Sequence, residues 1–410
     1  MKTIRAAAIG CAILCATPAL AAKPNILWIT FDAQSPRQLQ TTRTPAIDAI
    51  ARTGITYTQA HASATVCRPS RAGMHTGIHQ QRFGIYRNPP EDDREPATDP
   101  DPLPSSAVTI AEELRRVGYR TALFGKWHLG YSQATSPQRQ GFQSGAWYLG
   151  GGHPYYQGPL QGPHGTVRFT GNLTEWLGIQ AAGYIRTNRN RPWFVDLQLP
   201  APHEPLQSDP GQMAGCGTLT GPKRTLCGMI RGGDRAVASV MAALRSTGQL
   251  GRTLVVITAD NGCASGGVCD DGGLRGTKGQ VWEGGARVPL IVSLPGRLQG
   301  GARRAEPVSL LDIMPTSLAL AGVKPQRRQD GVSLLTRKAA RPLYFATAPG
   351  RVAMIQWPWK LYNEEGRWQL YNLSSDGNET RDVAGANPAV VQRMSAGAMR
   401  WNAALPPSSH

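Results

Sequence analysis

The stretch Asn25-Ile-Leu-Trp-Ile-Thr-Phe31 decides the fold, because it is an almost uninterrupted apolar run that stops at Asp32. Such a run is typical of a parallel strand that is buried on both faces of its sheet. It predicts a sheet covered by helices on both sides, with Asp32 at the carboxyl end of the strand. Open α/β sheets bind their ligands at that end.

Apolar strands continue to alternate with helices downstream, so we expect an α/β fold with a mostly parallel central sheet sandwiched by helices. Short strands after about residue 342 predict a small antiparallel C-terminal subdomain, which divides the chain into a main domain at 22–341 and a subdomain at 342–410. The expected helices are 45–53 (with Thr44 as N-cap), 109–117, 173–187, 225–247, 309–321 and one starting at Pro388. The expected strands are 25–31, 119–124, 193–199, 253–258, 289–294, 343–347, 354–356, 359–363 and 368–372.

The composition favours anionic partners. The 410 residues include 44 Lys and Arg against 27 Asp and Glu, which gives a formal charge of +17. With 40% hydrophobic and 17% charged residues, the chain is neither a disordered polyelectrolyte nor a membrane protein. Its basic residues run no longer than pairs and are not interleaved with aromatic residues, so we expect an anionic small molecule or polysaccharide as partner and no nucleic acid. The sequence makes no prediction of oligomeric state.

The first 21 residues have the pattern of a secretory signal peptide. Lys2 and Arg5 precede an apolar stretch at 6–14, and a small-residue cleavage site ends at Ala21. Removing the two basic residues leaves a mature charge of 17 − 2 = +15. No later run reaches the roughly 20 apolar residues of a transmembrane helix, so we expect a periplasmic or secreted protein without a transmembrane segment.

Five cysteines remain after the signal segment, and an exported chain meets an oxidising compartment. Cys216 and Cys227, and likewise Cys263 and Cys269, are close enough in sequence to close small loops, so we expect these two disulfides. Cys67 is then left over, and its explanation is intermolecular pairing, a reactive thiol or chemical conversion.

The segment around Cys67 favours conversion. Cys67-Arg68-Pro69-Ser70-Arg71, followed by Thr76-Gly77, resembles the signature of the type I sulfatases of the alkaline phosphatase superfamily. In that family a formylglycine-generating enzyme oxidises the cysteine to formylglycine, and we expect this enzyme as a maturation partner.

Further blocks extend the resemblance over nearly the whole mature chain in the family's order. They are Pro24 to Asp32, Gly125-Lys126-Trp127-His128-Leu129-Gly130, Pro200 to Pro205 around His203, Thr258-Ala259-Asp260-Asn261-Gly262, Leu274 to Pro289 around Lys278, Asp312 to Thr316, and Leu370 to Leu373. One short block is weak evidence, but a whole series of them in the right order is strong.

The resemblance implies a reaction at a sulfate ester. Asp32, Asp260, Asn261 and the residue made from Cys67 would bind one divalent cation, with Ca²⁺ expected and Mg²⁺ as the alternative. The hydrated formylglycine would attack sulfur through one hydroxyl, and His128 would take a proton from the other so that sulfate leaves.

The remaining site residues surround the sulfate. Arg71 would hold the hydrate and offset its charge. Lys126, His203 and Lys278 would clamp the sulfate oxygens, with Lys278 or His203 protonating the leaving oxygen. His153 would line the substrate pocket.

One position departs from the family, which commonly has two adjacent aspartates after the first strand. Here the pair is Asp32-Ala33, so one carboxylate ligand is missing, and water or the carboxamide of Gln34 could take its place. Asn261 favours sulfatases over the related phosphonate monoester hydrolases, which usually have a histidine there.

We therefore expect an exported hydrolase of sulfate esters, or of sulfamates, whose substrate is a sulfated small molecule or glycan. Two alternatives stay open: a phosphonate or phosphodiester hydrolase of the same superfamily, and a catalytically weak homologue that binds sulfated glycans.

Overall fold

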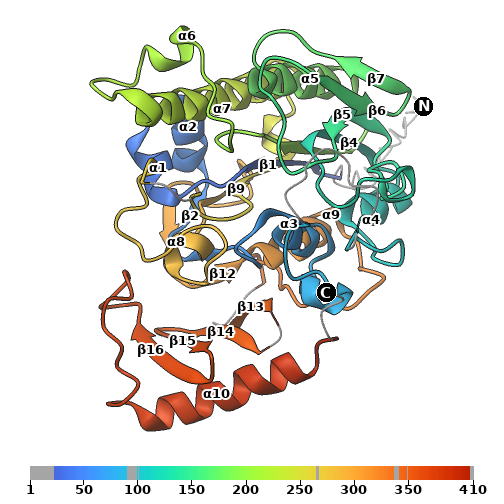
Figure 1. Ribbon diagram of the computed structural model, residues 1–410. Coiled ribbons are helices and arrows are strands. Elements are labelled where there is room, and N and C mark those ends of the chain that lie inside the picture. The colour runs from blue at the N-terminus through green and yellow to red at the C-terminus, as the bar shows by residue number, and fades with distance from the viewer. Residues whose placement is uncertain are drawn as a thin grey trace, which may run out of the picture.

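The computed structural model describes residues 23–89, 99, 101–264, 267–336, 341–348 and 350–406. The expected signal segment at 1–21 lies outside these residues. Figure 1 shows two parts: a large sheet between helices, and below it a smaller sheet that packs against the last helix.

A ten-stranded sheet forms the centre of the molecule, in the order β11-β2-β10-β9-β1-β8-β4-β5-β6-β7. Its five middle strands are parallel, as expected: β9 (Thr253–Ala259), β1 (Asn25–Phe31), β8 (Trp193–Gln198), β4 (Arg120–Lys126) and β5 (Ser144–Tyr148). The flanking strands break the pattern, since β10 (Leu290–Ser293) runs antiparallel to β9 and to β2 (Ile55–Tyr57). The edges are completed by β11 (Ala302–Arg304), β6 (Pro159–Gly162) and β7 (Gly165–Arg168).

Helices cover both faces of this sheet. Figure 1 shows one layer above the sheet and one below it. The upper layer consists of α2 (Pro45–Thr53), α5 (Leu173–Thr187) and α7 (Gly221–Ser246). The lower layer consists of α3 (Cys67–Thr76), α4 (Ile110–Arg116) and α9 (Ile313–Ala321). The shorter helices are α1 (Pro36–Thr41), α6 (Pro210–Met213) and α8 (Glu283–Ala286), and the two-residue strands β3 (Ala60–His61) and β12 (Val308–Ser309) pair with each other.

The capping of α2 differs from the prediction. Thr44 is at the N-cap position, but its side chain makes no capping hydrogen bond. Asp234 of α7 instead accepts from the backbone N–H groups of Ala46 and Ile47, at 3.0 and 2.9 Å. A carboxylate at a helix N-terminus also meets the positive end of the helix dipole, so a neighbouring helix replaces the local cap.

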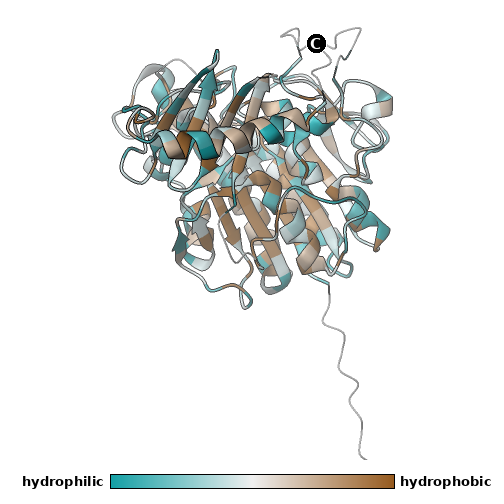
Figure 2. Ribbon diagram, turned by 90° about the horizontal axis from the view of Figure 1, so that it is seen from below, coloured by the Kyte–Doolittle hydropathy of each residue, from teal (hydrophilic) through white to brown (hydrophobic). Residues whose placement is uncertain are grey.

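The C-terminal part is an antiparallel sheet of four strands, as expected. These are β13 (Leu343–Ala348), β14 (Arg351–Gln356), β15 (Trp359–Glu364) and β16 (Arg367–Asn372). The amphipathic helix α10 (Pro388–Ala403) packs Met394 and Ala398 against this sheet. Figure 2 shows both colours along this helix, whereas the strands of the central sheet are mostly brown.

No helix among the described residues is long and apolar enough to cross a membrane.

Candidate active site

Four predicted site residues lie at or just beyond the carboxyl ends of parallel strands. Asp32 follows β1, Lys126 ends β4, His203 lies five residues beyond β8, and Asp260 follows β9. These strands are neighbours in the sheet, and the structure therefore gathers residues that are up to 228 positions apart in the sequence. Their common position is the ligand-binding edge expected of an open α/β sheet.

Cys67 opens α3 in the middle of this group and is completely buried. Its Sγ lies 3.4 Å from Asp32 Oδ1, and the amide of Asn261 donates to Sγ at 3.4 Å. Burial, together with the charges of Asp260 and Asp32, raises the pKa of the Cys67 thiol. The thiol is therefore uncharged near neutral pH, and the unmodified side chain is a poor nucleophile.

Arg71, one turn further along α3, contacts the carboxylates of the site. Its Nε donates to Asp260 Oδ2 at 2.9 Å, and a second nitrogen lies 3.4 Å from Asp32 Oδ2. A third nitrogen donates to Gln198 Oε1 at 2.6 Å. Arg71 thus balances the two acidic residues, and its role toward a hydrate of residue 67 stays a prediction.

Lys126 forms a buried ion pair with Asp32, with Nζ 2.6 Å from Oδ2. Burial alone would raise the pKa of Asp32, but the positive charges around it, Lys126 foremost, hold that pKa well below its usual range. Asp32 is therefore an anion, as a metal ligand must be.

His128 and His203 are both predominantly uncharged at neutral pH. Burial, followed by the charge of Lys126, lowers the pKa of His128 well below its usual range. Burial also lowers the pKa of His203. The Nδ1 atom of His128 is buried and has no hydrogen-bond partner among the described residues, so it is available to accept a proton.

Lys278 reaches the site from the loop that precedes α8. Its backbone N–H donates to Cys263 O at 2.7 Å, and the next residue, Gly279, donates to Thr65 O at 2.8 Å. Burial would lower the pKa of Lys278, but the negative charges that Cys67, Asp32 and Asp260 can carry raise it above its usual range. Lys278 is thus a cation beside residue 67.

The C-terminal part of the chain holds the end of this loop. Glu283 accepts from Lys360 of β15 at 2.9 Å, and its backbone N–H donates to Glu379 at 2.7 Å. Arg275 stacks on Trp282 at 3.7 Å and donates to the hydroxyl of Tyr371 at 2.9 Å. Buried charges from two parts of the molecule therefore fix the segment that carries Lys278.

The residues present fit a hard divalent cation. Asn261 donates through Nδ2 to Asp260 Oδ1 at 2.9 Å, while its Oδ1 is buried without a partner among the described residues. The Oε1 of Gln34 is likewise buried without a partner among the described residues, while its Nε2 donates to Ser35 O at 2.8 Å. Uncompensated buried oxygens, together with the ionised carboxylate of Asp32, are the donors that Ca²⁺ and Mg²⁺ prefer.

Another candidate ligand comes from His203, which was predicted as a sulfate contact and possible proton donor but not as a metal ligand. One potential ligand atom each from Asp32, Cys67 and His203 lies within 4.8 Å of the others.

Ala33, which replaces the second aspartate of the family pattern, is fixed tightly in the loop after β1. Its φ is +61°, and its backbone N–H donates to Asp260 Oδ1 at 3.0 Å. The backbone at this position therefore supports the metal ligands, although the side chain supplies no oxygen.

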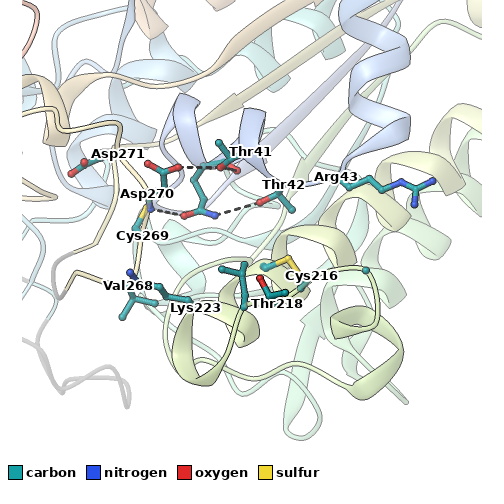
Figure 3. Close-up of a pocket in the computed structure, with 15 residues that line it drawn as sticks. Thr41, Thr42, Arg43, Cys216, Thr218, Lys223, Val268, Cys269, Asp270 and Asp271 are labelled. Atoms are coloured by element: carbon teal, nitrogen blue, oxygen red, sulfur yellow. Dashed lines mark hydrogen bonds between the residues drawn. A yellow bond between two sulfur atoms is a disulfide. The ribbon is translucent and has the colours of Figure 1, made fainter.

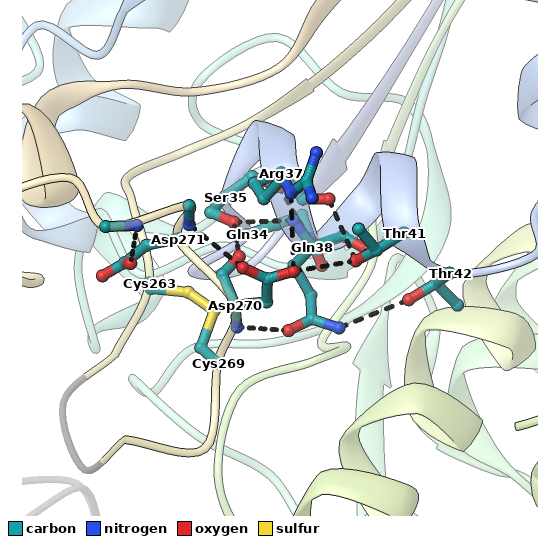
Figure 4. Close-up of a disulfide and its surroundings, with 12 residues drawn as sticks. Gln34, Ser35, Arg37, Gln38, Thr41, Thr42, Cys263, Cys269, Asp270 and Asp271 are labelled. Atoms are coloured by element: carbon teal, nitrogen blue, oxygen red, sulfur yellow. Dashed lines mark hydrogen bonds and ion pairs between the residues drawn. A yellow bond between two sulfur atoms is a disulfide. The ribbon is translucent and has the colours of Figure 1, made fainter. Parts of the chain in front are cut away.

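The two expected disulfides, Cys216–Cys227 and Cys263–Cys269, are both present, which confirms the predicted pairing. Figure 4 shows the second one, which closes the loop that follows Asp260 and Asn261. Cys67 has no disulfide partner in the described part of the chain.

His153 lies near the site but outside its first contacts. Its ring centroid is 5.1 Å from that of Tyr148, the last residue of β5, and both ring nitrogens lie near backbone carbonyls, of Pro154 and Pro159. Its role in a substrate pocket stays a prediction.

Gln198 and His75 also support the site, although no sequence motif pointed to them. Gln198 orients Arg71, while His75 contacts the backbone oxygen of Arg71 at 2.8 Å and Asp196 at 2.7 Å. One signal was available, since Asp196 and Gln198 interrupt the apolar pattern of a strand predicted to be buried.

Comparison with known proteins finds similar sequences and a similar fold. The Sulfatase family model matches residues 24–323. Arylsulfatase A of Bos taurus is 33% identical over 366 residues, which cover 78% of this chain and 69% of that protein. N-acetylgalactosamine-6-sulfatase of Mus musculus is 27% identical and covers 88% of this chain and 76% of that protein. The crystal structure of Ps i-CgsB in complex with k-i-k-neocarrahexaose has a TM-score of 0.88 and 29% identity, and the match covers 94% of each chain.

Proposed function

Because the chain belongs to the sulfatase family and is a sulfuric ester hydrolase, we propose that it removes sulfate from an anionic carbohydrate through a formylglycine made from Cys67. The observation that carries this proposal is the position of Cys67. It is buried and free of disulfides, and it lies between the carboxylate of Asp32 and the amide of Asn261. A thiol whose pKa is raised would not serve there as a nucleophile, whereas a hydrated aldehyde would offer two hydroxyls.

Asp32, Asp260, Asn261 and the modified residue 67 would hold a divalent cation, and we propose Ca²⁺. His203 and Gln34 supply further donor atoms nearby. The cation, when bound, acts as a Lewis acid that stabilises negative charge on oxygen.

The chain's own residues divide the remaining work. Lys126 and Lys278 are cations that can hold sulfate oxygens as negative charge builds on them. Lys278, or His203 in its protonated minority form, can give a proton to the departing alcohol. Neutral His128 can take the proton from the hydroxyl of residue 67 when sulfate is released.

Several observations support a sulfated carbohydrate as substrate. The mature charge of +15 would raise the encounter rate with polyanions. Ps i-CgsB, whose structure was solved in complex with k-i-k-neocarrahexaose, is 29% identical in sequence to this chain. The signal-peptide pattern at the N-terminus supports export. We therefore propose that the protein acts in the periplasm or outside the cell.

The test is sulfate release by protein that has been produced with a formylglycine-generating enzyme. Rates on 4-nitrophenyl sulfate and on a phosphate diester of the same phenol should be measured in parallel. Faster turnover of the sulfate supports the proposal, whereas a faster diester reaction would assign the chain to phosphodiester chemistry. Binding of sulfated glycans without any turnover by fully converted protein would instead favour a glycan-binding role.

A further inference from the structure

The excess positive charge of the chain is concentrated at the amino ends of the central parallel strands. Five short segments lie there, and we call them together the basic face: 23–24, 115–120, 186–191, 245–252 and 324–328. They contain 12 Lys and Arg residues and no Asp or Glu. Outside the basic face and the signal segment, 44 − 2 − 12 = 30 basic residues stand against 27 acidic ones, so the rest of the chain is almost balanced.

The pairing of the strands brings these segments together. The strands β9, β1, β8 and β4 are neighbours and run parallel, so their amino ends lie at one edge of the sheet. The first residue of β1 pairs with the first residue of β9, and the first residue of β4 pairs with the first residue of β8. The segments that lead into these four strands are therefore side by side, although they are far apart in the sequence.

Hydrogen bonds connect the segments to one another. Lys23 Nζ donates to Val117 O at 2.8 Å. Arg116 donates to Lys324 O at 3.1 Å, which joins the segment after α9 to the end of α4. Arg252 donates to a backbone carbonyl of the segment that precedes β8. The basic face is thus one continuous surface.

Its charges are accessible and almost without counter-charges. Eleven of the twelve basic residues are exposed, and Arg252 is partly buried. Within the described part of the chain, only Arg116 has a carboxylate partner, Glu113, at 3.0 Å. Clustered like charges repel one another, and a bound polyanion would relieve this repulsion.

Helix dipoles account for only part of this cluster. The helices α4, α5 and α7 also end at this edge, and cations are favourable near helix C-termini. Only four of the twelve cations lie in the last turn of a helix, and these are Arg115, Arg116, Arg186 and Arg245. The other eight lie outside the helices, so they need another explanation.

The concentration of charge is not a property of the sulfate site. That site has three cations, Arg71, Lys126 and Lys278, against the carboxylates of Asp32 and Asp260, which leaves one positive charge in excess. It also lies at the opposite edge of the sheet. Since β1 spans seven residues, the basic face and the site are about 23 Å apart, at about 3.3 Å per residue.

The cavity drawn in Figure 3 does not hold the excess charge either. It has a volume of about 680 Å³ and is lined by two cations, Arg43 and Lys223, and by two carboxylates, Asp270 and Asp271. Its formal charge is therefore zero.

The chemistry of the basic face favours a sulfated polymer over a membrane surface. Ten of its twelve cations are arginines, whose planar guanidinium group can donate two hydrogen bonds to one tetrahedral oxyanion. Surfaces that bind membranes combine basic residues with apolar side chains that enter the lipid. None of the large hydrophobic residues that are exposed in the described part of the chain belongs to the basic face.

We propose that the basic face binds a sulfated polysaccharide, as a second binding surface that is separate from the sulfate site. The choice of this polymer as partner rests on the proposed function. A chain held at the basic face would keep the enzyme on its polymer while the site at the opposite edge stays open to a sulfate ester.

The test is calorimetric binding of dextran sulfate by a face variant, Arg120→Gln/Arg189→Gln/Arg191→Gln. The matched control is Arg381→Gln/Arg393→Gln/Arg400→Gln, which removes the same charge from exposed residues of the C-terminal part. We expect the face variant to raise Kd about tenfold at low salt and the control to change it less than about twofold. The difference should vanish in 1 M salt, where the Debye length is about 3 Å.

Turnover of 4-nitrophenyl sulfate by converted protein separates this proposal from the proposed function. We expect the face variant to keep the wild-type kcat/KM, because none of its three residues belongs to the sulfate site. If converted protein shows no turnover while the face variant alone binds dextran sulfate more weakly, the proposed function fails and the binding surface stands.

Two outcomes would overturn the binding surface. Equal affinities of the face variant and the control for dextran sulfate would show that only the net charge matters. A wild type that binds phosphatidylglycerol vesicles but no dextran sulfate would assign the basic face to a membrane surface. Neither outcome affects the sulfatase reaction.

Discussion

Lys126 Nζ lies 2.6 Å from Asp32 Oδ2, while the other oxygen of the same carboxylate faces Cys67 Sγ at 3.4 Å. One oxygen of Asp32 is thus engaged by a buried cation and the other is directed at the residue proposed to become the nucleophile. This arrangement keeps Asp32 ionised and orients it, and it brings the Lys126 ammonium close to the reacting group.

Lys126→Met should lower kcat/KM by about 10² to 10³, the effect typical of losing one donor to developing negative charge. Lys126→Arg is the matched control, because it restores the charge. We expect it to recover little, since a planar guanidinium does not replace a compact ammonium in a fully buried position. If kcat/KM of Lys126→Met on 4-nitrophenyl sulfate is within threefold of the wild-type value, Lys126 takes no part in the reaction.

Ala33→Asp should tighten Ca²⁺ binding by supplying the missing carboxylate. The backbone at Ala33 has a φ of +61°, a conformation that Asp and Asn tolerate better than most residues. Ala33→Asn is the neutral control, and affinities should rise in the order wild type, Asn, Asp. Calorimetric titration with Ca²⁺ and the accompanying shift in melting temperature report this without any turnover. A wild type that already binds as tightly as Ala33→Asp would show that another oxygen, such as that of Gln34, completes the site.

Lys360→Met should both destabilise the protein and weaken catalysis. Lys360 lies 2.9 Å from Glu283 and 2.9 Å from Glu379, and all three side chains are buried. Removing one partner from a buried ion pair typically costs about 3–5 kcal/mol. We further expect kcat to fall, because Glu283 anchors the loop that carries Lys278.

Urea unfolding and steady-state kinetics at 20 °C below the melting temperature separate the two effects of Lys360→Met. Lys324→Met is the control, with a change in unfolding free energy within about 0.5 kcal/mol. A destabilised variant with an unchanged kcat would show that the ion pairs of Lys360 with Glu283 and Glu379 have a structural role only.

Acidification should destabilise the fold through His79. Burial lowers the pKa of this histidine to about 4 from its usual 6.5, and its ring packs against Trp401 and Tyr344. Between these two pH values the unfolded chain binds a proton that the folded chain does not, so stability falls as the pH drops from 6.5 toward 4. The maximal loss is on the order of 3 kcal/mol.

His79→Phe keeps an aromatic ring without a titrating group, and it should flatten this part of the pH dependence. Free energies of unfolding measured from pH 4.5 to pH 7 decide the matter. An identical slope in both proteins would assign the acid sensitivity to other groups.

Local patterns in the sequence were enough to predict much of the fold. The predicted bounds of α2 and α5 match the structure, because Pro45 and the end of each apolar face mark them clearly. The direction of β10 was not predictable in the same way, since its apolar run suits a parallel or an antiparallel strand equally well. Likewise, β5, β6 and β7 lack long apolar runs that would mark them in the sequence. The hairpin of β6 and β7 is defined only by the pairing of these strands with each other and with β5.

The same distinction holds at the site. Residues that follow strands, such as Asp32 and Asp260, could be predicted because parallel strands bring their carboxyl ends together. Lys360 and Glu379 could not, because their role comes from contacts 77 and 96 positions away in the sequence. Such pairings depend on how the C-terminal sheet packs against the main sheet, and no short motif records them.

The most direct test of the account is a peptide mass map of the segment containing Cys67, made on protein that was matured with a formylglycine-generating enzyme and assayed for sulfate release. We predict that residue 67 carries the aldehyde, that sulfate release rises in proportion to the converted fraction, and that Cys67→Ala releases none. A fully active protein in which residue 67 is still a thiol would contradict the account.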